Sequence, residues 1–562
     1  MLRIKRPLIV FALFGNASLL AGCGGSSDSA STEQAPADTT PPSVTSVTPA
    51  AGMTDVQRDV ELTASFNEDM LGTSVSDRTV HLSLNGSDVP ASVTFDGASN
   101  VATLTPEKPL SLLGHYQVTL DAAVADLSGN GLSSSVTSSF TVRDGAWGNT
   151  ATPFNIQQPL DKFDVQIATD TDGNAIAAWV TAQNKPVSSR YTPEAGWSTP
   201  VDLYDNDYNY AIAGTPRVAI DNEGNATAVW FTYYNNGGYY ILSNRYTKGS
   251  GWGTAVKIDD DYVYPGVIQL GFDEQGNALV IWSGRSPTNI HRVRTNRYSQ
   301  QSESWGDATT IASTSDSIDL KEPQIATSAD GNGFAVWVQD NAGTCTIQVS
   351  RYSADNSVWG AAQNVGPGLC SAKPQIGADG AGNAIVAWEQ AESVFSIQAN
   401  RYTAGEGWGT IQEIEPNVLA ETYPQIAVTP KGDAMVVWRQ RQPMYTGYWI
   451  RASRYMKQSN SWSQPENIDE GDSDEIRFHQ VALDVDGNAL ALWRHVENSK
   501  DEVRAARYVA GSGWNAAVTI SPENPAYTTT SLQITVDPSG AGTAFWVQTP
   551  GSDSDIYRKR FD

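Results

Sequence analysis

The stretch that decides the fold is Asp221-Asn222-Glu223-Gly224-Asn225-Ala226-Thr227-Ala228-Val229-Trp230, a tight turn followed by an apolar run that ends in tryptophan. A similar stretch is Asp484-Val485-Asp486-Gly487-Asn488-Ala489-Leu490-Ala491-Leu492-Trp493. Copies recur every 50 to 55 residues, and such a period indicates a repeat architecture. The eight copies end at Trp179, Trp230, Trp282, Trp337, Trp388, Trp438, Trp493 and Trp546. Each run is short enough to be a buried strand.

Two further markers divide each unit. An Arg-Tyr pair, or Arg-Phe in the last copy, comes at Arg190-Tyr191, Arg245-Tyr246, Arg297-Tyr298, Arg351-Tyr352, Arg401-Tyr402, Arg454-Tyr455, Arg507-Tyr508 and Arg560-Phe561. A second tryptophan follows at Trp197, Trp252, Trp305, Trp359, Trp408, Trp462 and Trp514, with an extra copy at Trp147. The unit therefore predicts four strands joined by short turns, with the longest link leading to the next unit, as in a propeller blade.

The two ends of the repeat region predict how it closes. The chain stops at Asp562 directly after the eighth third strand, whereas residues 147–156 supply an orphan fourth strand before the first complete unit. Pairing these two pieces removes sheet edges that invite aggregation. We therefore expect an all-β chain in which residues 144–562 form an eight-bladed β-propeller, closed by an N-terminal strand and preceded by an Ig-like β-sandwich.

Residues 41–143 alternate apolar and polar side chains in short runs, as in Val60-Glu61-Leu62-Thr63-Ala64-Ser65-Phe66. Period two between Gly, Pro, Asn and Asp turns predicts half-buried strands in an antiparallel sandwich. The stretch resembles the SbsA-type bacterial Ig-like domain at Pro41-Pro42, Val47-Thr48-Pro49, Ala64-Ser65-Phe66-Asn67-Glu68-Asp69-Met70, Leu104-Thr105-Pro106 and Asp126-Leu127-Ser128-Gly129-Asn130-Gly131-Leu132. The resemblance implies a spacer that presents another domain rather than a domain that carries chemistry.

Residues 1–22 have the pattern of a secretory signal, with a basic start, an apolar run over 8–14 and then Leu20-Ala21-Gly22-Cys23. The last four residues look like a bacterial lipobox, which implies cleavage before Cys23 and lipid attachment to its thiol. The alternative is an ordinary signal with a chance cysteine. Residues 23–40 lack large apolar side chains and predict a flexible tether. We expect a lipid-anchored protein of the cell envelope, and Gly24 after the cysteine favours the outer membrane.

The composition limits the partners. Asp and Glu number 62 against 36 Lys and Arg, so the formal net charge is −26 and nucleic acid and anionic lipid are disfavoured. No later apolar run reaches the roughly 18 residues of a membrane helix, so we expect membrane contact through the lipid only. Cys345 and Cys370 are the remaining cysteines, and an exported protein favours a disulfide between them. We expect a monomer without a cofactor.

One register of the inner strands carries polar side chains. It predicts a ring around the axis, formed by Gln166, Arg217, Gln269, Gln324, Gln375, Gln425, Gln480 and Gln533. Either these groups satisfy one another, the backbone and water, or they bind a ligand. General acid–base catalysis needs titratable groups where the substrate lies, and only Arg217 is charged in this ring. This composition disfavours an enzyme.

Two motifs resemble metal ligands. Asp170-Thr171-Asp172-Gly173-Asn174 is similar to the start of a calcium loop, but no Glu follows at the distance of an EF-hand, so a tight turn is favoured. His479 and His495 are predicted on one sheet face of the seventh unit, where a metal site is the alternative to ordinary core residues. We expect no metal.

The most informative cluster is aromatic and surrounds the second unit. Its members lie in one second-to-third-strand loop and in the links on either side of that unit, at Tyr204, Tyr208, Tyr210, Tyr233, Tyr234, Tyr239, Tyr240, Tyr262 and Tyr264. Carboxylates lie among them at Asp205, Asp207, Asp259, Asp260 and Asp261. Exposed loops on a rigid scaffold gather binding sites. Aromatic rings beside carboxylates suit sugars or a cationic peptide, and the alternative is loops that pack on one another.

These observations favour a lipid-anchored envelope protein that presents a propeller face for glycan or protein recognition. One alternative is an envelope assembly scaffold, because the outer-membrane assembly lipoprotein with eight blades is similar in architecture, although its repeat motif differs. Another is a polysaccharide hydrolase or lyase. The repeat region resembles lectin and sialidase-like propellers at the level of the fold only, so the resemblance implies no catalytic residue.

Overall fold

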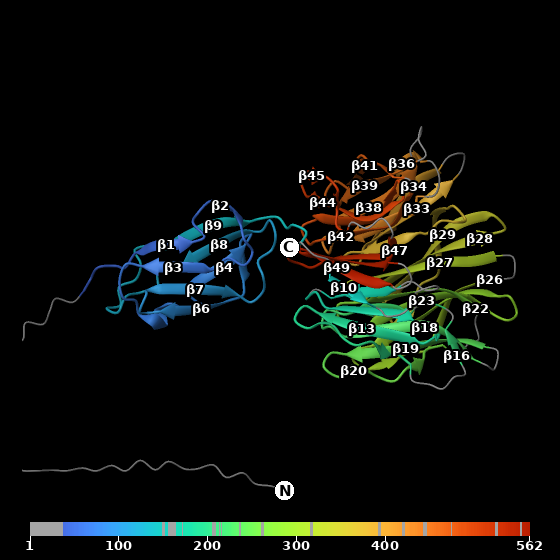
Figure 1. Cartoon of the computed structure of the whole chain (residues 1–562), viewed down its shortest axis with the longest axis horizontal. Coiled ribbons are helices and arrows are strands. Elements are labelled where there is room, and N and C mark those ends of the chain that lie inside the picture. Colours follow the sequence, from blue (N-terminus) through green and yellow to red (C-terminus); the bar gives the residue numbers. More distant parts are fainter. Residues whose placement is uncertain are drawn as a thin grey trace, which may run out of the picture.

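The computed structural model describes residues 38–148 and most of 152–562. Outside the description lie 1–37, 149–151, 156–164, 171, 182, 205–209, 213, 215, 235–237, 260–263, 315–317, 392–394, 419–421, 442–446, 474, 523–526 and 551–553. Figure 1 shows a small sandwich beside a larger body of radiating sheets. The described residues are all-β, apart from the short 3-10 helix η1 (Gly72–Ser74). Across the described ranges no helix is long and apolar enough to cross a bilayer.

The smaller body is a sandwich of two sheets around one core. One sheet has the order β1 (Val44–Thr48), β3 (Leu62–Phe66), β7 (Val101–Pro106), β6 (Ala91–Asp96), and the other β2 (Met53–Val56), β9 (Val136–Val142), β8 (His115–Leu120), β4 (Val80–Leu84), β5 (Ser87–Val89). Buried and half-buried residues alternate along β3, as expected for a strand with one face in the core. Leu62, Leu104 and Phe140 lie in that core.

The larger body consists of eight sheets within the described residues, each built from consecutive antiparallel strands. The first strands are β11 (Gln166–Thr169), β17 (Arg217–Ile220), β22 (Tyr264–Phe272), β27 (Ile318–Thr327), β32 (Gln375–Ala378), β37 (Gln425–Val428), β42 (Glu475–Leu483) and β47 (Tyr527–Val536). The second strands are β12 (Ala175–Val180), β18 (Ala226–Tyr234), β23 (Ala278–Arg285), β28 (Gly333–Asn341), β33 (Ala384–Ala391), β38 (Ala434–Arg441), β43 (Ala489–Glu497) and β48 (Gly542–Pro550). The third strands are β13 (Pro186–Thr192), β19 (Gly238–Thr247), β24 (His291–Ser299), β29 (Thr344–Ser353), β34 (Phe395–Thr403), β39 (Tyr448–Met456), β44 (Lys500–Val509) and β49 (Asp555–Phe561).

The fourth strand of seven of these sheets is broken into two short segments, where the sequence predicts one. The first segments are β14 (Gly196–Trp197), β20 (Gly251–Trp252), β25 (Ser304–Trp305), β30 (Val358–Trp359), β35 (Gly407–Trp408), β40 (Ser461–Trp462) and β45 (Gly513–Trp514). The second segments are β15 (Val201–Asp202), β21 (Val256–Lys257), β26 (Thr309–Thr314), β31 (Gln363–Pro367), β36 (Gln412–Val418), β41 (Glu466–Ser473) and β46 (Val518–Thr519). Both segments pair with the third strand. An additional strand, β16 (Tyr210–Ile212), pairs with β18.

The second strands are buried on both faces, which explains why they read as continuous apolar runs rather than alternating ones. Every residue of β12 is buried, and each of the eight terminal tryptophans is at most 1% exposed. Trp388, for example, packs with residues of β28 and β29, in the preceding sheet. The large indole therefore fills the space between neighbouring sheets and holds them together.

The eight sheets follow one another in space in chain order. Each first strand contacts the next one, and β47 also contacts β11. The strand β10 (Thr152–Asn155) pairs antiparallel with β49, so that Phe154 lies opposite Ile556. Trp147 forms a bridge with Phe561 just outside these strands. The last sheet thus contains a strand from before the first one.

Antiparallel order divides the connections between two opposite faces. The first-to-second and third-to-fourth turns, such as 221–225 and 248–250, form what we name the turn face. The second-to-third loops and the links between sheets form the loop face. The Ig-like domain contacts the turn face: Leu112 N donates to the Ser539 carbonyl over 2.8 Å, and the Arg58 guanidinium donates to the Ser539 hydroxyl over 2.7 Å. Asp144, at the start of the repeat region, lies 3.1 Å from the Arg507 guanidinium. The loop face is therefore opposite to the Ig-like domain.

Candidate ligand-binding face

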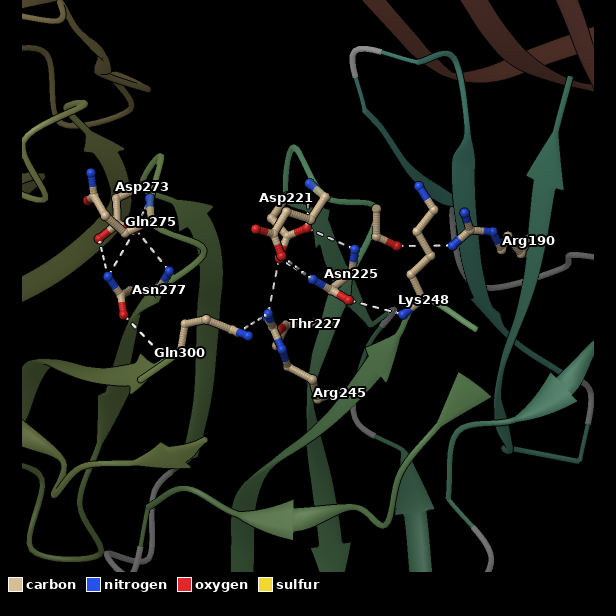
Figure 2. A network of polar contacts seen from close by, with 12 residues as sticks. Arg190, Asp221, Asn225, Thr227, Arg245, Lys248, Asp273, Gln275, Asn277 and Gln300 are labelled. Atoms are coloured by element: carbon tan, nitrogen blue, oxygen red, sulfur yellow. Dashed lines mark hydrogen bonds and ion pairs between the residues drawn. The ribbon is translucent and has the colours of Figure 1, made fainter. Parts of the chain in front are cut away.

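The calcium-like motifs are turns whose carboxylates are used locally, as Figure 2 shows for Asp221. Its Oδ1 accepts from the Asn225 backbone N–H over 2.8 Å, and its Oδ2 accepts from the Asn225 side chain over 3.1 Å. The Asn225 side-chain oxygen in turn accepts from the backbone N–H of Lys248, in the neighbouring turn, over 3.0 Å. Asp170 and Asp484 make the corresponding bonds. These oxygens stabilise the turn face.

The Arg-Tyr marker joins each sheet to the next. Arg245 donates to Asp221 Oδ2 over 3.1 Å, and its guanidinium carbon lies 4.6 Å from the centre of the Tyr298 ring (Figure 2 shows the polar part). Guanidinium-to-ring distances of 4.6 to 6.0 Å recur for the pairs Arg190/Tyr246, Arg245/Tyr298, Arg297/Tyr352, Arg351/Tyr402, Arg401/Tyr455, Arg454/Tyr508, Arg507/Phe561 and Arg558/Tyr191. In the last pair Arg558 takes the place expected for Arg560.

The second tryptophan of each unit packs at the turn-face end of its sheet, against the tyrosine of the Arg-Tyr pair. Trp197 is the cross-strand partner of Tyr191, and the two ring centres lie 5.4 Å apart. The extra copy, Trp147, lies 5.4 Å from the ring of Phe561. The terminal tryptophan, the Arg-Tyr pair and the second tryptophan therefore all pack against residues of the fold. The described residues of the turn face stabilise the contacts between sheets and the contact to the Ig-like domain. A ligand site is to be sought on the loop face.

The tyrosine cluster lies on the loop face, and the structure describes part of it. Tyr208 and Tyr262 lie outside the described residues, as do Asp205, Asp207, Asp260 and Asp261. The backbones of Tyr210 and Tyr234 pair with each other, but their side chains are not described. The described side chains are those of Tyr204, Tyr233, Tyr239, Tyr240 and Tyr264.

Three of these rings form a row across β18, β19 and β22. The centre of the Tyr239 ring lies 4.9 Å from that of Tyr233 and 6.1 Å from that of Tyr264. Tyr264 is 41% exposed, and the guanidinium carbon of Arg285 lies 5.5 Å from its ring centre. Beside the row, Lys257 Nζ lies 3.8 Å from the centre of the Tyr240 ring. The row combines accessible aromatic surface with cationic groups.

Two members of the predicted site have packing roles instead. Tyr204 is half-buried, with its ring centre 6.3 Å from that of the buried Trp230. Asp259 is buried and forms an ion pair with Arg294, whose guanidinium also donates to the Ala308 carbonyl over 3.1 Å. This carboxylate is therefore held by the fold. The expectation of carboxylates beside the rings is not met at Asp259, because a buried charge requires a partner of its own.

The polar ring occupies the same register in all eight sheets, at the loop-face end of the first strands. Each of its members lies opposite the residue that precedes a terminal tryptophan, as Gln269 lies opposite Ile281. All eight are half-buried. Arg217 donates to the Gln166 side-chain oxygen, and Gln425 donates to the Pro424 carbonyl over 3.1 Å. These eight residues therefore lie at one level of the first strands, toward the loop face, which we call the mouth.

Backbone bulges at this mouth were not foreseen from the sequence. Four residues with positive φ lie two positions before a ring glutamine, namely Glu322, Tyr423, Phe478 and Ser531, with φ of 52°, 49°, 54° and 50°. Such angles are unfavourable for side chains other than glycine and persist only where the surroundings fix them. The only local signal is Pro323 or Pro424 between bulge and glutamine in two of the four.

Charged groups of the preceding sheet, two buried and one half-buried, bond to the backbone at or near three of these positions. Glu389 accepts from the Tyr423 backbone N–H over 3.1 Å and from the Thr422 hydroxyl over 2.8 Å. Arg439 donates to the Ile476 carbonyl over 3.0 Å, two residues before Phe478. Asp501 accepts from the Thr529 backbone N–H over 3.0 Å, two residues before Ser531. The strained backbone at the mouth is thus held in place by specific bonds.

A cavity of about 550 Å³ opens between two of these bulges. It is lined by Lys373, Tyr423, Gln425, Arg439, Arg477, Phe478, His479 and Gln480, from the fifth, sixth and seventh sheets. The Tyr423 ring centre lies 4.7 Å from the Arg439 guanidinium carbon and 5.2 Å from Lys373 Nζ. Phe478 is 37% exposed beside them. The cavity therefore combines three cations with two aromatic rings.

His479 adds no charge to this cavity. It is buried, and its Nε2 lies 2.6 Å from the Tyr423 carbonyl oxygen. Because a carbonyl can only accept, Nε2 carries the proton and donates. Burial lowers the pKa of His479 from 6.5 to about 4, so the ring is neutral at physiological pH.

The remaining predicted residues lie in separate places. His495 lies 3.4 Å from Asp469 Oδ2 and 3.5 Å from Glu497 Oε2, and within the part of the chain that is described it shares no group of metal ligands with His479. Cys345 and Cys370 are joined by a disulfide on the loop face, with Cα atoms 5.2 Å apart. Cys23 lies outside the described residues.

Comparison with known proteins characterises the fold. Residues 38–142 match the model of the bacterial Ig-like domain, which confirms the resemblance of the first domain. A comparison with curated proteins found no match. Among solved structures the chain is similar to a lectin from Burkholderia pseudomallei, with 12% identity, 64% of this chain and 99% of that chain covered, and a TM-score of 0.42.

Two further solved structures are similar over comparable lengths. One is an ulvan lyase of a new polysaccharide lyase family, with 11% identity, 67% of this chain and 96% of that chain covered, and a TM-score of 0.39. The other is a lectin from Aleuria aurantia described as a six-bladed β-propeller, with 11% identity, 64% and 97% covered, and a TM-score of 0.35. All three likenesses concern the fold alone.

Proposed function

We propose that this protein is a lipid-anchored, non-enzymatic binding protein of the cell envelope, which recognises a glycan with the loop face of a closed, eight-bladed β-propeller. The observation that carries the proposal is the row of Tyr233, Tyr239 and Tyr264 with Arg285 at its exposed end. Tyr239 has aromatic counterparts at Phe395 and Tyr448 in the same register. The position of Tyr233, three residues after the terminal tryptophan, carries no aromatic residue in the other units, so a local function accounts for the row better than the repeat does.

Three contacts support a closed ring of eight blades. The first strands contact one another in succession, including β47 with β11. The strand β10 adds a fourth strand to the last sheet. Arg558 lies over the Tyr191 ring at 4.6 Å, which extends the series of interblade contacts across the junction of the two chain ends.

The position of the Ig-like domain supports the proposal that the loop face is the face accessible to a ligand. It contacts the turn face through Leu112 and Arg58, so the loop face lies on the far side of the propeller from it. With a lipid on Cys23 and a tether over 23–40, the Ig-like domain would stand between the membrane and the propeller. The loop face is then the one that a ligand in solution meets.

The chemistry of the row suits a carbohydrate. Aromatic faces pack against the C–H surface of a sugar ring, and the tyrosine hydroxyls and Arg285 offer polar groups to its hydroxyls. Binding sites typically combine apolar lining with a few polar groups that fix orientation. Asp259 is bonded to Arg294, so among the described residues the polar groups that this row offers are cations and hydroxyls.

A glycan array with wild-type protein and a Tyr239→Ser, Tyr264→Ser double variant tests this function. We expect the double variant to lose binding by about tenfold or more, with a small change in melting temperature, because Tyr264 is an exposed ring. The matched control is Tyr298→Ser on the turn face, which should lower the melting temperature and leave binding intact. Unchanged binding by the double variant contradicts the site, and turnover of a polysaccharide panel contradicts the non-enzymatic assignment.

A further inference from the structure

The cavity at the axial mouth is cationic in a protein whose formal net charge is −26. Lys373 is exposed and forms no ion pair with any residue that the structure describes. Arg477 has a side chain that is 56% exposed and contacts Glu475 over 2.6 Å, and Glu475 also contacts Arg494 over 3.1 Å. Arg494 has a further partner in Asp501 over 2.8 Å, so Glu475 is the carboxylate beside Arg477, and the positive charge of the cavity comes from Lys373 and Arg439 in addition.

We propose that this cavity is a second binding site, separate from the tyrosine row, for the anionic sugar units of an acidic polysaccharide. Lys373 and Arg477 would contact the carboxylate or sulfate of the sugar, and Phe478 would pack against its ring. The cavity of about 550 Å³ is within the size range of small-molecule sites. The proposal goes beyond the proposed function, which does not require it.

The backbone at Phe478 supports a ligand role for that ring. A phenylalanine is held at φ 54°, although glycine would adopt this angle without strain. The residue is 37% exposed, which is unusual for so large an apolar side chain next to a buried sheet. Strain at an exposed aromatic residue is expected where the side chain serves recognition rather than packing.

The neutral groups in the cavity complete the match. Gln425 and Gln480 carry amides that both donate and accept, as sugar hydroxyls require. Among the described residues of the lining, the titratable groups other than His479 and Tyr423 are basic, namely Lys373, Arg439 and Arg477. An anionic sugar therefore meets attraction from three sides, whereas a cationic peptide meets repulsion.

Isothermal titration calorimetry of the full chain with three probes tests the proposal. The probes are oligogalacturonate, a sulfated oligosaccharide such as a carrageenan fragment, and a neutral galactose oligomer. We expect binding of at least one anionic probe, weakened by salt, and about tenfold weaker or absent binding of the neutral one. The Lys373→Gln, Arg477→Gln double variant should weaken anionic binding by about tenfold or more. The matched control is Lys431→Gln on the turn face, where an exposed lysine pairs with Asp486 over 2.8 Å.

A second variant separates ligand contact from folding. Phe478→Gly removes the ring and suits the backbone angle, so we expect it to fold and to bind the anionic probe about tenfold more weakly. Ser531→Gly makes the same change at the matching bulge of the eighth sheet, outside the cavity lining, and should bind as wild type does. Binding that is independent of Lys373, Arg477 and Phe478, equal affinity for the neutral probe, or no binding of either anionic probe overturns the proposal. Loss of neutral-glycan binding in the tyrosine variant alone bears on the tyrosine row and not on this cavity.

Discussion

The two faces of the repeat region are built from the same sheets and follow opposite rules. On the turn face the contacts between sheets repeat: the contact that Arg245 makes to the next sheet has a counterpart at every junction. On the loop face the notable residues occur once, as with Tyr264 and Phe478. The repeated arginines and aromatic residues hold the sheets together, whereas Tyr264 and Phe478 are large exposed rings that belong to no repeated marker. In such a protein, departures from the repeat indicate where to look for binding.

The largest expected difference between the two faces is the loss in free energy of unfolding when an arginine is replaced by alanine. Arg245→Ala leaves the buried carboxylate of Asp221 without its guanidinium and removes the contact to Tyr298. We expect a loss of about 3 kcal/mol in the free energy of unfolding. Arg285→Ala on the loop face should cost less than about 1 kcal/mol, because its partner Tyr264 is exposed. Urea denaturation measures both, and equal losses would remove the distinction between the faces.

The disulfide is a covalent link on the loop face, where the repeated interblade arginine contacts of the turn face are absent among the described residues. Cys345 and Cys370 are separated by 25 positions in sequence, and opening that loop should cost about 3 kcal/mol in the chain-entropy model. The Cys345→Ser, Cys370→Ser variant should melt at a lower temperature than wild type and be insensitive to reductant. A wild-type melting temperature that reductant leaves unchanged would contradict this expectation.

The loop face should also carry a dependence on pH. The unfolded chain binds a proton at His479 near pH 6.5, whereas the folded chain does so only near pH 4. Stability therefore falls as the pH drops through this window, by an amount on the order of 3 kcal/mol. His479→Gln keeps an N–H donor for the Tyr423 carbonyl and cannot titrate. Denaturation curves at pH 7 and pH 4 should show a smaller loss in this variant, and equal losses would show that His479 is not the group responsible.

The smallest expected effect concerns the bulges themselves. Phe478→Gly and Ser531→Gly relieve an unfavourable φ but add freedom to the unfolded chain, so the two contributions nearly cancel. We expect the free energy of unfolding to change by less than about 1 kcal/mol in either variant. A loss well above that value would mean that the side chain, rather than the bonds from Arg439 and Asp501, holds the bulge.

The fold could be predicted to this extent because its determinants are local and repeated. Trp230 ends a strand, Arg245 ends the next, and the spacing between them sets the sheet without information from elsewhere. The strand at residues 147–156 could be assigned to the last sheet by counting, because the eighth unit lacks a fourth strand in the sequence. The Ig-like domain was expected from short local motifs in residues 41–143, and the match over residues 38–142 confirms it.

The candidate sites could be predicted only in part, because they are assembled from distant segments. The tyrosine row was recognised as a local excess, but nothing in the sequence indicates that Asp259 is bonded to Arg294. The cationic cavity escaped notice because Lys373, Arg439 and Arg477 come from three sheets and belong to no motif. Positive φ at Tyr423 and Phe478 depends on bonds from the preceding sheet, which sequence spacing does not reveal.

The contact between the Ig-like domain and the last sheet has a mechanical consequence. A force applied at the N-terminal end of the described chain passes through the Ig-like domain. Along the chain it would then reach β10, the short strand that joins the last sheet. The bond from Leu112 to Ser539 and the ion pair between Asp144 and Arg507 both come before β10 along that path. A force applied at the N-terminal end therefore loads these two contacts before it can separate β10 from β49.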